Sequence, residues 1–554
     1  MVSRQPISDL SDNFLLHGSR NALPEQHNLC AGPINVIYEN GNLRSFKLGE
    51  IEILRMIYPA VRDPDWNTVL PEIQSEFIQN EADGFQITYH AVYDGFGIKF
   101  EADFLFLGRK DGSVLCSMKG IALEDFMKNR IGFCILHPIH TCAGKNVIVG
   151  HSDGSIDESF FPDVISPHQP FQDIAFLEYE THGNIKARLD FEGDVFESED
   201  QRNWTDSSYK IYSTPLSLPF PVLIKKNTVI QQHVRFSLLD YPKRSEIKLA
   251  KKNRIEVFIL EQESKMPFIG MLHSSRFNDL GEYELSLLKE LHLNHIRADL
   301  LLSSNDWENK LTESNLVAKK MGVPLFLSLE FDDNFEQVTK RFVDTCYTMF
   351  PRIVDILLVN KNSKVTNNNL FASVESILRE ALKNIQLGAG TNAYFAEFNR
   401  NKPFHSHADF LVWSMNPQVH AFDHQTLVEN LQAQADTIIT ARTFFPDVPL
   451  YVSPVTLRPR FNPNVTRTGI LVDSFNSLPD SRQMSMFAAC WLVGSIKYLA
   501  ESGVSKVTFF ETAGEKGVIQ GMDDSYWPSI FPSKKKYDFP YILCFERIAK
   551  ILPR

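Results

Sequence analysis

Two glutamates, Glu397 and Glu511, each end an apolar stretch of the kind that forms a buried strand, in "NAYFAE" and "KVTFFE". Carboxyl groups in such positions can perform acid–base catalysis, because apolar surroundings keep one protonated while the other stays ionised. That chemistry suits hydrolysis at a sugar. We therefore predict Glu397 and Glu511 as the catalytic pair. The alternative for each is a simple ion pair, for example between Glu397 and Arg400.

Other polar side chains follow the remaining apolar stretches in the same half of the sequence. The candidates for binding a substrate are His273, Arg297, Asp299, Asn416 and His420, and similar positions are held by Glu330, Asn360, Asn399 and Arg458. Arg297, Asn416 and His420 could donate hydrogen bonds to an oxyanion that develops on a carbonyl group. A histidine base oriented by Glu511 is an alternative to the carboxylate pair.

The segment "EDQRNWTD", residues 199–206, gathers polar groups around one tryptophan. We predict Asp200, Arg202, Asn203 and Trp204 as substrate-binding residues, because a guanidinium group and an amide recognise carboxylates and hydroxyls. The alternative is a solvated loop between strands. We expect the segment mainly to brace the second half of the molecule, with partial contact to substrate.

Eight alternations of an apolar strand and a helix are expected within residues 266–554. The expected strands are 267–273, 294–300, 323–331, 354–360, 390–400, 409–422, 448–457 and 505–514. This repetition is typical of a TIM (β/α)8 barrel, which usually takes about 250 residues and carries its reactive groups at the C-terminal ends of the strands. The predicted catalytic pair would then lie on one rim.

The first half of the sequence has a different pattern. Residues 1–245 are expected to form an antiparallel β-sandwich, and the charged residues 246–265 a linker. Asn40-Gly41 and Asp94-Gly95 stand between runs of alternating apolar and polar residues, and such dipeptides favour tight hairpin turns. Short strands with frequent turn signals indicate a sandwich.

The composition disfavours several classes of partner. The 554 residues carry a net charge of −12, so no excess of basic side chains is available for nucleic acid. We expect neither a signal peptide nor a membrane span, because no apolar run is long enough. Seven scattered cysteines without a CxxC motif predict free thiols in a cytoplasmic protein. The sequence does not specify an oligomeric state.

No cofactor or metal is expected. The sequence has no phosphate-binding loop, no dinucleotide fingerprint and no nucleophile elbow. His137, His140 and Cys142 resemble a metal-binding pattern, but they stand among strands and turns without a second pair of ligands, which tetrahedral zinc would need. Any reaction would therefore rely on side chains.

The strings "NRIGFCILHP" and "FEGDVFESEDQRNWTDSSYKIYSTPLSLPFPV", and later "GTNAYFAEFNR" and "NPQVHAFD", resemble the bacterial D-apionate lactonase family over nearly the whole chain from about residue 30. The resemblance implies a β-rich domain followed by a glycosidase-like TIM barrel, with a small sugar lactone as substrate. It implies hydrolysis of D-apionolactone to D-apionate in the catabolism of apiose. It also implies a small β domain after the barrel, which we expect to be absent because the final residues read as the last barrel helix.

Two other functions remain open. A glycoside hydrolase could use the same carboxylate pair, although many retaining glycosidase barrels end the fourth strand in Asn-Glu and here Asn360 precedes Lys361. A barrel without catalytic activity could bind a carbohydrate, since fold alone does not define function.

Overall fold

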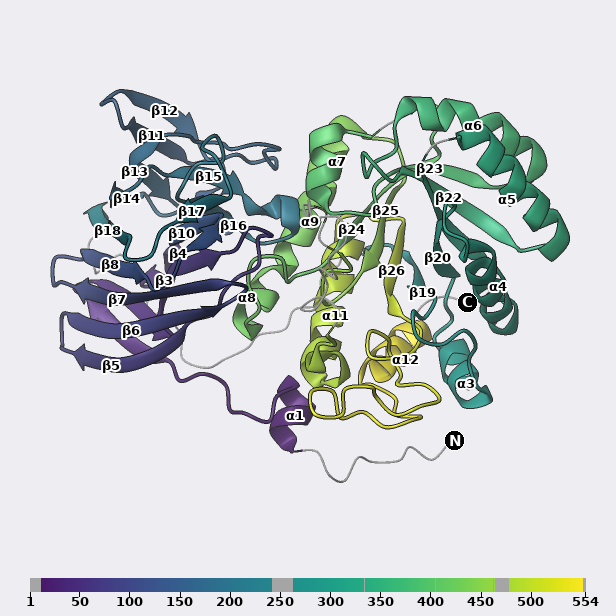
Figure 1. Cartoon of the computed structure of the whole chain (residues 1–554), viewed down its shortest axis with the longest axis horizontal. Coiled ribbons are helices and arrows are strands. Elements are labelled where there is room, and N and C mark those ends of the chain that lie inside the picture. The colour runs from purple at the N-terminus through teal and green to yellow at the C-terminus, as the bar shows by residue number, and fades with distance from the viewer. Residues whose placement is uncertain are drawn as a thin grey trace.

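The computed structural model describes residues 11–241, 263–332, 334–403, 405–461, 463 and 478–551. An antiparallel β-sandwich lies beside a closed parallel barrel with helices on its outside (Figure 1). This arrangement confirms the predicted fold class. Of the linker expected at 246–265, the part up to residue 262 lies outside the described residues.

The sandwich consists of two antiparallel sheets and a small ribbon. The first sheet has the order β1-β2-β3-β4-β10-β16-β15, the second β12-β11-β13-β14-β18-β8-β7-β6-β5, and the ribbon β17-β9. The strands are β1 (His27–Ala31), β2 (Ile34–Glu39), β3 (Asn42–Leu48), β4 (Ile51–Arg62), β5 (Glu72–Asn80), β6 (Phe85–Gly95), β7 (Ile98–Gly108), β8 (Val114–Ala122), β9 (Phe126–Lys128), β10 (Arg130–Pro138), β11 (Asn146–His151), β12 (Ile156–Phe160), β13 (Ile174–Thr181), β14 (Ile185–Glu192), β15 (Glu197–Asp200), β16 (Ser208–Tyr212), β17 (Val222–Ile224) and β18 (Val229–Asp240). A short helix, α2 (Ile139–Cys142), follows β10.

Period-two alternation builds the sandwich core. Every second side chain of β6 and β7 is buried, as a sheet with one covered face requires. The turn predicted at Asn40-Gly41 is confirmed, and both residues have positive φ angles, of 46° and 76°. The hairpin β6–β7 turns instead at Phe96 and Gly97, because Gly95 still pairs with Ile98 in the ladder.

The barrel closes in the order β19-β20-β21-β22-β23-β24-β25-β26. Its strands are β19 (Phe268–Leu272), β20 (His295–Leu301), β21 (Leu325–Phe331), β22 (Ile353–Asn360), β23 (Gln386–Gly390), β24 (Phe410–Met415), β25 (Leu450–Val455) and β26 (Lys506–Glu511). The helices are α3 (Glu282–Glu290), α4 (Trp307–Met321), α5 (Phe335–Met349), α6 (Asn368–Ala381), α7 (Phe395–Asn401), α8 (His424–Glu429), α9 (Leu431–Phe444), α11 (Met486–Glu501) and α12 (Tyr541–Ile551), with a 3-10 turn η2 (Ser481–Met484) before α11. Within the described part of the chain, no helix has the length and apolarity to cross a membrane.

Six of the eight barrel strands match their predicted positions to within three residues at each end. The sixth, predicted at 409–422, is shorter, because β24 ends at Met415, and the fifth lies before its predicted position. The prediction placed it at 390–400, whereas β23 ends at Gly390 and residues 395–401 form α7. Apolar residues at 393–396 do not form the wall of the barrel but the start of a helix that packs on β24.

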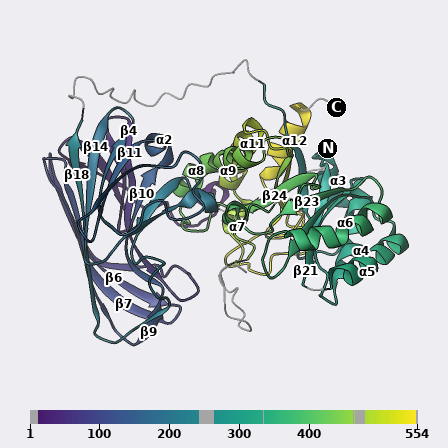
Figure 2. The same cartoon turned by 90° about the horizontal axis from the view of Figure 1, so that it is seen from above.

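The sandwich meets the barrel at the loops that follow β23 and β24. The 3-10 turn η1 (Gln201–Trp204) contacts α7 and α9, and α7, α8 and α9 all face the sandwich (Figure 2). The first helix, α1 (Asp12–His17), lies on the barrel, since Phe14 belongs to the barrel core and α1 contacts α11. The sandwich is therefore anchored on the C-terminal side of the barrel strands.

Candidate active site

The mouth of the barrel holds a carboxylate between two guanidinium groups. Asp299 on β20 accepts a hydrogen bond of 2.8 Å from Nε of Arg297, and its other oxygen bonds to Arg460, which follows β25. Burial alone would raise the pKa of the Asp299 carboxyl, but the two arginines outweigh it and lower this pKa to about 2. Asp299 is therefore a fixed negative charge at neutral pH.

Arg297 is committed to the protein. Besides the bond to Asp299, its guanidinium donates to the Ser453 carbonyl oxygen and to Oδ1 of Asn392, and it is fully buried. Three of its donors are therefore engaged within the protein, and its role as an oxyanion donor stays a prediction.

Glu511 ends β26 and is held by the loop after β19. Its Oε2 accepts hydrogen bonds of 2.8 Å from the backbone N–H and 2.9 Å from the hydroxyl of Ser275. Burial raises the pKa of Glu511, and the Ser275 bonds with the charges of Lys516 and Arg460 offset part of this effect. The side chain is thus fixed in orientation and its carboxyl pKa lies above the ordinary value, which is compatible with acid–base chemistry, and the catalytic role of Glu511 stays a prediction.

A second carboxyl group with a raised pKa lies on β21. Glu330 accepts a 2.7 Å hydrogen bond from Nδ2 of Asn392, which also donates to Ser328. Burial raises the pKa of Glu330, the Asn392 bond lowers it, and the charge of Asp299 raises it further. The sequence marks Glu330 only as a polar residue near a strand end, and its place beside Asp299 makes it a candidate for catalysis.

Arg460 is the common neighbour of these carboxylates. Its charge acts on Asp299, Glu330 and Glu511, which come from β20, β21 and β26. It also donates to the Asn392 carbonyl oxygen, at 3.2 Å. The mouth thus combines two carboxyl groups with raised pKa values, one ionised carboxylate and two guanidinium groups, an arrangement that can activate water and stabilise an anionic oxygen.

Glu397 has different neighbours from Glu511. It occupies the first turn of α7, where its Oε2 accepts a 3.0 Å hydrogen bond from the backbone N–H of Tyr394 and closes a capping box. Burial raises its pKa, and the cations that act on it are Arg400 and Lys364. The prediction that Glu397 ends a strand is wrong, and the structure gives its carboxylate a capping role.

His273 follows β19 at the mouth. Its Nε2 atom is buried without a hydrogen-bond partner in the described part of the chain, and burial lowers the pKa of its imidazole. The substrate-binding role of His273 stays a prediction.

The segment 199–206 forms β15 and η1 and lies against the barrel. The guanidinium of Arg202 forms two bonds with Asp200, of 2.9 and 2.7 Å, and donates to the Asp163 and Pro162 carbonyl oxygens. Asn203 donates to the Ser166 carbonyl oxygen and accepts a 3.0 Å bond from Asn399 of α7. Asp200 at the end of β15 and Arg202 and Asn203 of η1 are almost fully buried, so we interpret these three residues as braces.

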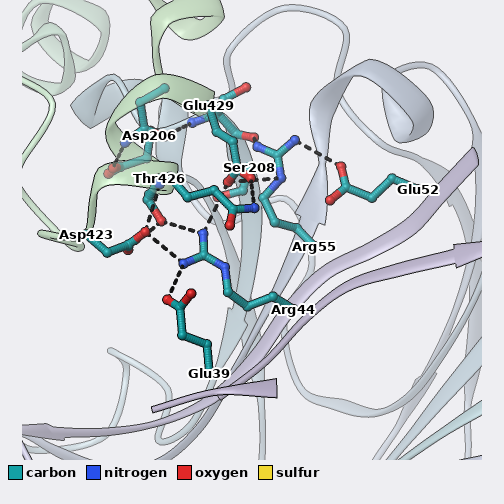
Figure 3. Close-up of polar contacts among 12 residues, drawn as sticks. Glu39, Arg44, Glu52, Arg55, Asp206, Ser208, Asp423, Thr426 and Glu429 are labelled. Atoms are coloured by element: carbon teal, nitrogen blue, oxygen red, sulfur yellow. Dashed lines mark hydrogen bonds and ion pairs between the residues drawn. The ribbon is translucent and has the colours of Figure 1, made fainter. Parts of the chain in front are cut away.

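Two arginines of the sandwich extend this contact. Arg44 on β3 donates to Asp423 at 2.7 Å and to Thr426 at 3.0 Å, at the start of α8. Arg55 on β4 donates to the Ser207 carbonyl oxygen at 2.7 Å and lies 3.8 Å from Glu429. Figure 3 shows both guanidinium groups pointing from the strands towards the helix, which fixes the orientation of the two domains.

His420 and Trp204 lie together at this junction. His420 Nδ1 is 2.5 Å from Oδ2 of Asp206, and its ring makes an edge contact with Trp204 at 5.3 Å. Burial raises the pKa of Asp206 to about 8, and burial with the charges of Lys210 and Arg62 lowers that of His420. Asn416 is buried nearby, where its carbonyl oxygen accepts from Thr205 and its side chain from the backbone of Gln418.

Potential metal ligands gather elsewhere. Glu375, His405 and His407 are the group of this kind among the described residues, and Glu375 already pairs with Arg379. His137 is buried between Phe161 and Tyr179, with its pKa lowered by burial to about 3.

The chain is a TIM-barrel protein with an N-terminal sandwich and with two carboxyl groups of raised pKa at the barrel mouth. Residues 14–240 match the D-apionate lactonase N-terminal domain, and residues 269–551 match the D-apionate lactonase TIM barrel domain. The chain belongs to the D-apionate lactonase family.

A curated relative supports the same assignment. The D-apionate lactonase of Brucella anthropi is 28% identical over 530 residues, which cover 92% of this chain and 86% of that protein. Among solved structures, a β-glucuronidase from Ruminococcus gnavus in complex with D-glucaro 1,5-lactone aligns over 87% of this chain and 69% of its own, with 9% identity and a TM-score of 0.33. AbfB, a family 51 α-L-arabinofuranosidase from Bifidobacterium longum, aligns over 52% and 73%, with 10% identity and a TM-score of 0.36.

Proposed function

We propose that this protein hydrolyses D-apionolactone to D-apionate, with the reaction at the barrel mouth. Membership of the D-apionate lactonase family supports the substrate. The observation that carries the chemistry is the cluster of Asp299, Glu330 and Glu511 around Arg460, because ester hydrolysis needs a base, an acid and a cation at the developing oxyanion.

Glu511 is the general base of this proposal. The two hydrogen bonds from Ser275 favour its ionised form and orient it. The carboxylate removes a proton from water, whose oxygen attacks the lactone carbonyl carbon. Arg460 stabilises the negative charge that develops on the carbonyl oxygen.

Glu330 is the general acid. When the bond between the carbonyl carbon and the ring oxygen breaks, Glu330 gives its proton to that oxygen, which becomes the hydroxyl of the open acid. Its raised pKa keeps it protonated at a higher pH than an ordinary glutamate. In this proposal Glu330 has the role of second catalytic carboxyl group that was predicted for Glu397, whose carboxylate caps α7.

We further propose that the reaction belongs to apiose catabolism and takes place in the cytoplasm. The seven cysteines are free thiols, as expected in a reducing compartment. A small neutral sugar lactone is the partner that the reaction requires.

The test measures acid release from D-apionolactone in a pH-stat with purified protein, alongside a panel of aryl glycosides. Lactone turnover without glycoside cleavage is expected. Glu511→Gln should lower kcat by about 100-fold or more. The control is Glu501→Gln, an exposed glutamate at the end of α11 that pairs with Lys497, and it should retain normal turnover. Cleavage of glycosides alone, or normal turnover by Glu511→Gln, contradicts the proposal.

A further inference from the structure

A cavity of about 410 Å³ lies between the sandwich and the barrel. Strands β4, β10, β15 and β16 and the loop 66–70 line it from the sandwich, and the loops after β23, β24 and β25 line it from the barrel. A volume of this size suits a small organic molecule. We call this space the junction pocket.

The junction pocket carries more cations than anions. Arg62, Arg130, Lys210 and Arg400 line it, against the carboxylate of Glu199. Lys210 forms an ion pair with Glu199. Within the part of the chain that the structure describes, the three arginines have no carboxylate at ion-pair distance, so the lining attracts an anion.

Arg130 gives the strongest indication of a ligand, because it is buried and has an unused hydrogen-bond donor. It is 5% exposed, and its terminal nitrogens donate to the Asn129 and Pro215 carbonyl oxygens at 2.7 and 3.0 Å. Its Nε is buried without a partner in the described structure, and the rings of Trp66 and Phe220 lie 5.5 and 5.0 Å from the guanidinium carbon. A buried cation with an unused donor is costly unless a ligand completes it.

The remaining polar groups of the junction pocket suit hydroxyls. Because His420 uses Nδ1 for Asp206, its Nε2 is the free ring nitrogen, and it lies 3.9 Å from Glu199. The Ser213 hydroxyl accepts a bond from Gln232 and keeps its own proton to donate. Aromatic side chains, among them Trp204, offer faces for the carbon skeleton of a sugar.

The junction pocket is distinct from the mouth. None of the residues that line it belongs to the cluster of Asp299, Glu330, Arg460 and Glu511. Tyr394 stands at the boundary, and its hydroxyl donates a 2.9 Å hydrogen bond to the Phe461 carbonyl oxygen, next to Arg460.

We propose that the junction pocket is a second ligand site, which binds a hydroxylated carboxylate of the sugar-acid class. Arg130, Arg62 and Arg400 bind the carboxylate, while Glu199, His420 and Ser213 bind hydroxyls. The anionic class follows from the lining, and the choice of a sugar acid rests on the proposed function, whose product carries a carboxylate that the lactone lacks. Product could thus occupy the protein at a place other than the catalytic centre.

The test is calorimetric titration of the full-length protein with sodium D-apionate, and with D-apiose as the uncharged comparison. Arg130→Gln and the exposed Arg400→Gln should each weaken D-apionate binding by about tenfold or more, because each loses a charge-assisted hydrogen bond. Arg130→Lys, which keeps the charge, should recover part of the affinity. Arg188→Gln is the matched control, since this arginine pairs with Glu178 and Asp190 on another sheet.

Arg460→Gln separates the two sites. It removes the cation that acts on all three carboxyl groups of the mouth, so D-apionate binding should persist in this variant if the junction pocket is the site. Loss of binding in Arg460→Gln with normal affinity in Arg130→Gln and Arg400→Gln overturns the inference, as does equal affinity for D-apiose. Binding that follows the junction arginines in a protein without lactonase activity would refute the proposed function and leave the second site intact. Melting temperatures of all variants identify any that do not fold.

Discussion

Replacing Arg202 by Met tests whether η1 braces the domain junction. The guanidinium is 1% exposed and makes four hydrogen bonds of 2.7 to 2.9 Å, two with Asp200 and two with the carbonyl oxygens of Pro162 and Asp163. The variant leaves the Asp200 carboxylate buried without its cation. Removing one partner of a buried ion pair costs about 3–5 kcal/mol, and we expect that loss in the free energy of unfolding.

The assay is urea denaturation followed by circular dichroism and tryptophan fluorescence, with Asp200→Asn and the double variant completing a cycle. The double variant removes the orphaned charge, so the coupling energy between the two positions should be about 1–3 kcal/mol. KM for the lactone, measured well below the melting temperature, distinguishes the two roles of Arg202. Loss of a substrate-binding residue would raise KM, whereas loss of a brace would leave it unchanged. A cost below about 1 kcal/mol for Arg202→Met, or a double variant no more stable than the single one, would refute the bracing role.

Three further results are expected. Glu330→Gln should lower kcat by about 100-fold or more, measured in the pH-stat, because the leaving oxygen loses its proton donor; a change of less than threefold would rule out Glu330 as the acid. The base Glu511 must be ionised to act, and its raised pKa means that it becomes protonated at a higher pH than an ordinary glutamate. As pH decreases, kcat/KM should therefore fall around a pH above about 4.3, the usual glutamate pKa. A fall centred at or below that pH contradicts the assignment of Glu511 as the base. Arg44→Ala should lower the melting temperature by several degrees, since Asp423 and Glu429 lose a buried cation, and an unchanged melting curve would show that this network does not hold the domains together.

The regular part of the fold was predictable from the sequence, because period-two alternation and strand–helix repetition are local signals. The sandwich, the barrel and the turn at Asn40-Gly41 all follow from them. The fifth strand was misplaced, since an apolar run such as 393–396 fits a buried strand and a buried helix start equally well. That error moved Glu397 from the first turn of α7 to a strand end.

The arrangement of the site depends on contacts that no periodicity encodes. Glu511 and Glu330 are candidates because each stands at or near the end of a predicted strand, but Arg460 and Asn392 lie in loops, where no apolar periodicity marks a residue. The lining of the junction pocket exists only when the two domains are docked. Trp204 and His420 are the substrate-binding candidates among its residues, whereas Glu199 is considered only as part of the segment 199–206 and Arg400 only as a neighbour of Glu397. The interpretation of Arg202 as a brace rests on its burial, which the sequence does not show.

The position of α1 has a consequence for synthesis of the chain. The Ser481 hydroxyl donates to the carbonyl oxygen of Gly18, the residue that ends α1, across 463 residues of sequence. At about 5–20 residues per second, a ribosome needs roughly 25–90 s to make the intervening chain. Helix α1 therefore cannot make its contacts with η2 and α11 until these elements have been synthesised. The sandwich can fold on the ribosome long before α1 packs against the barrel.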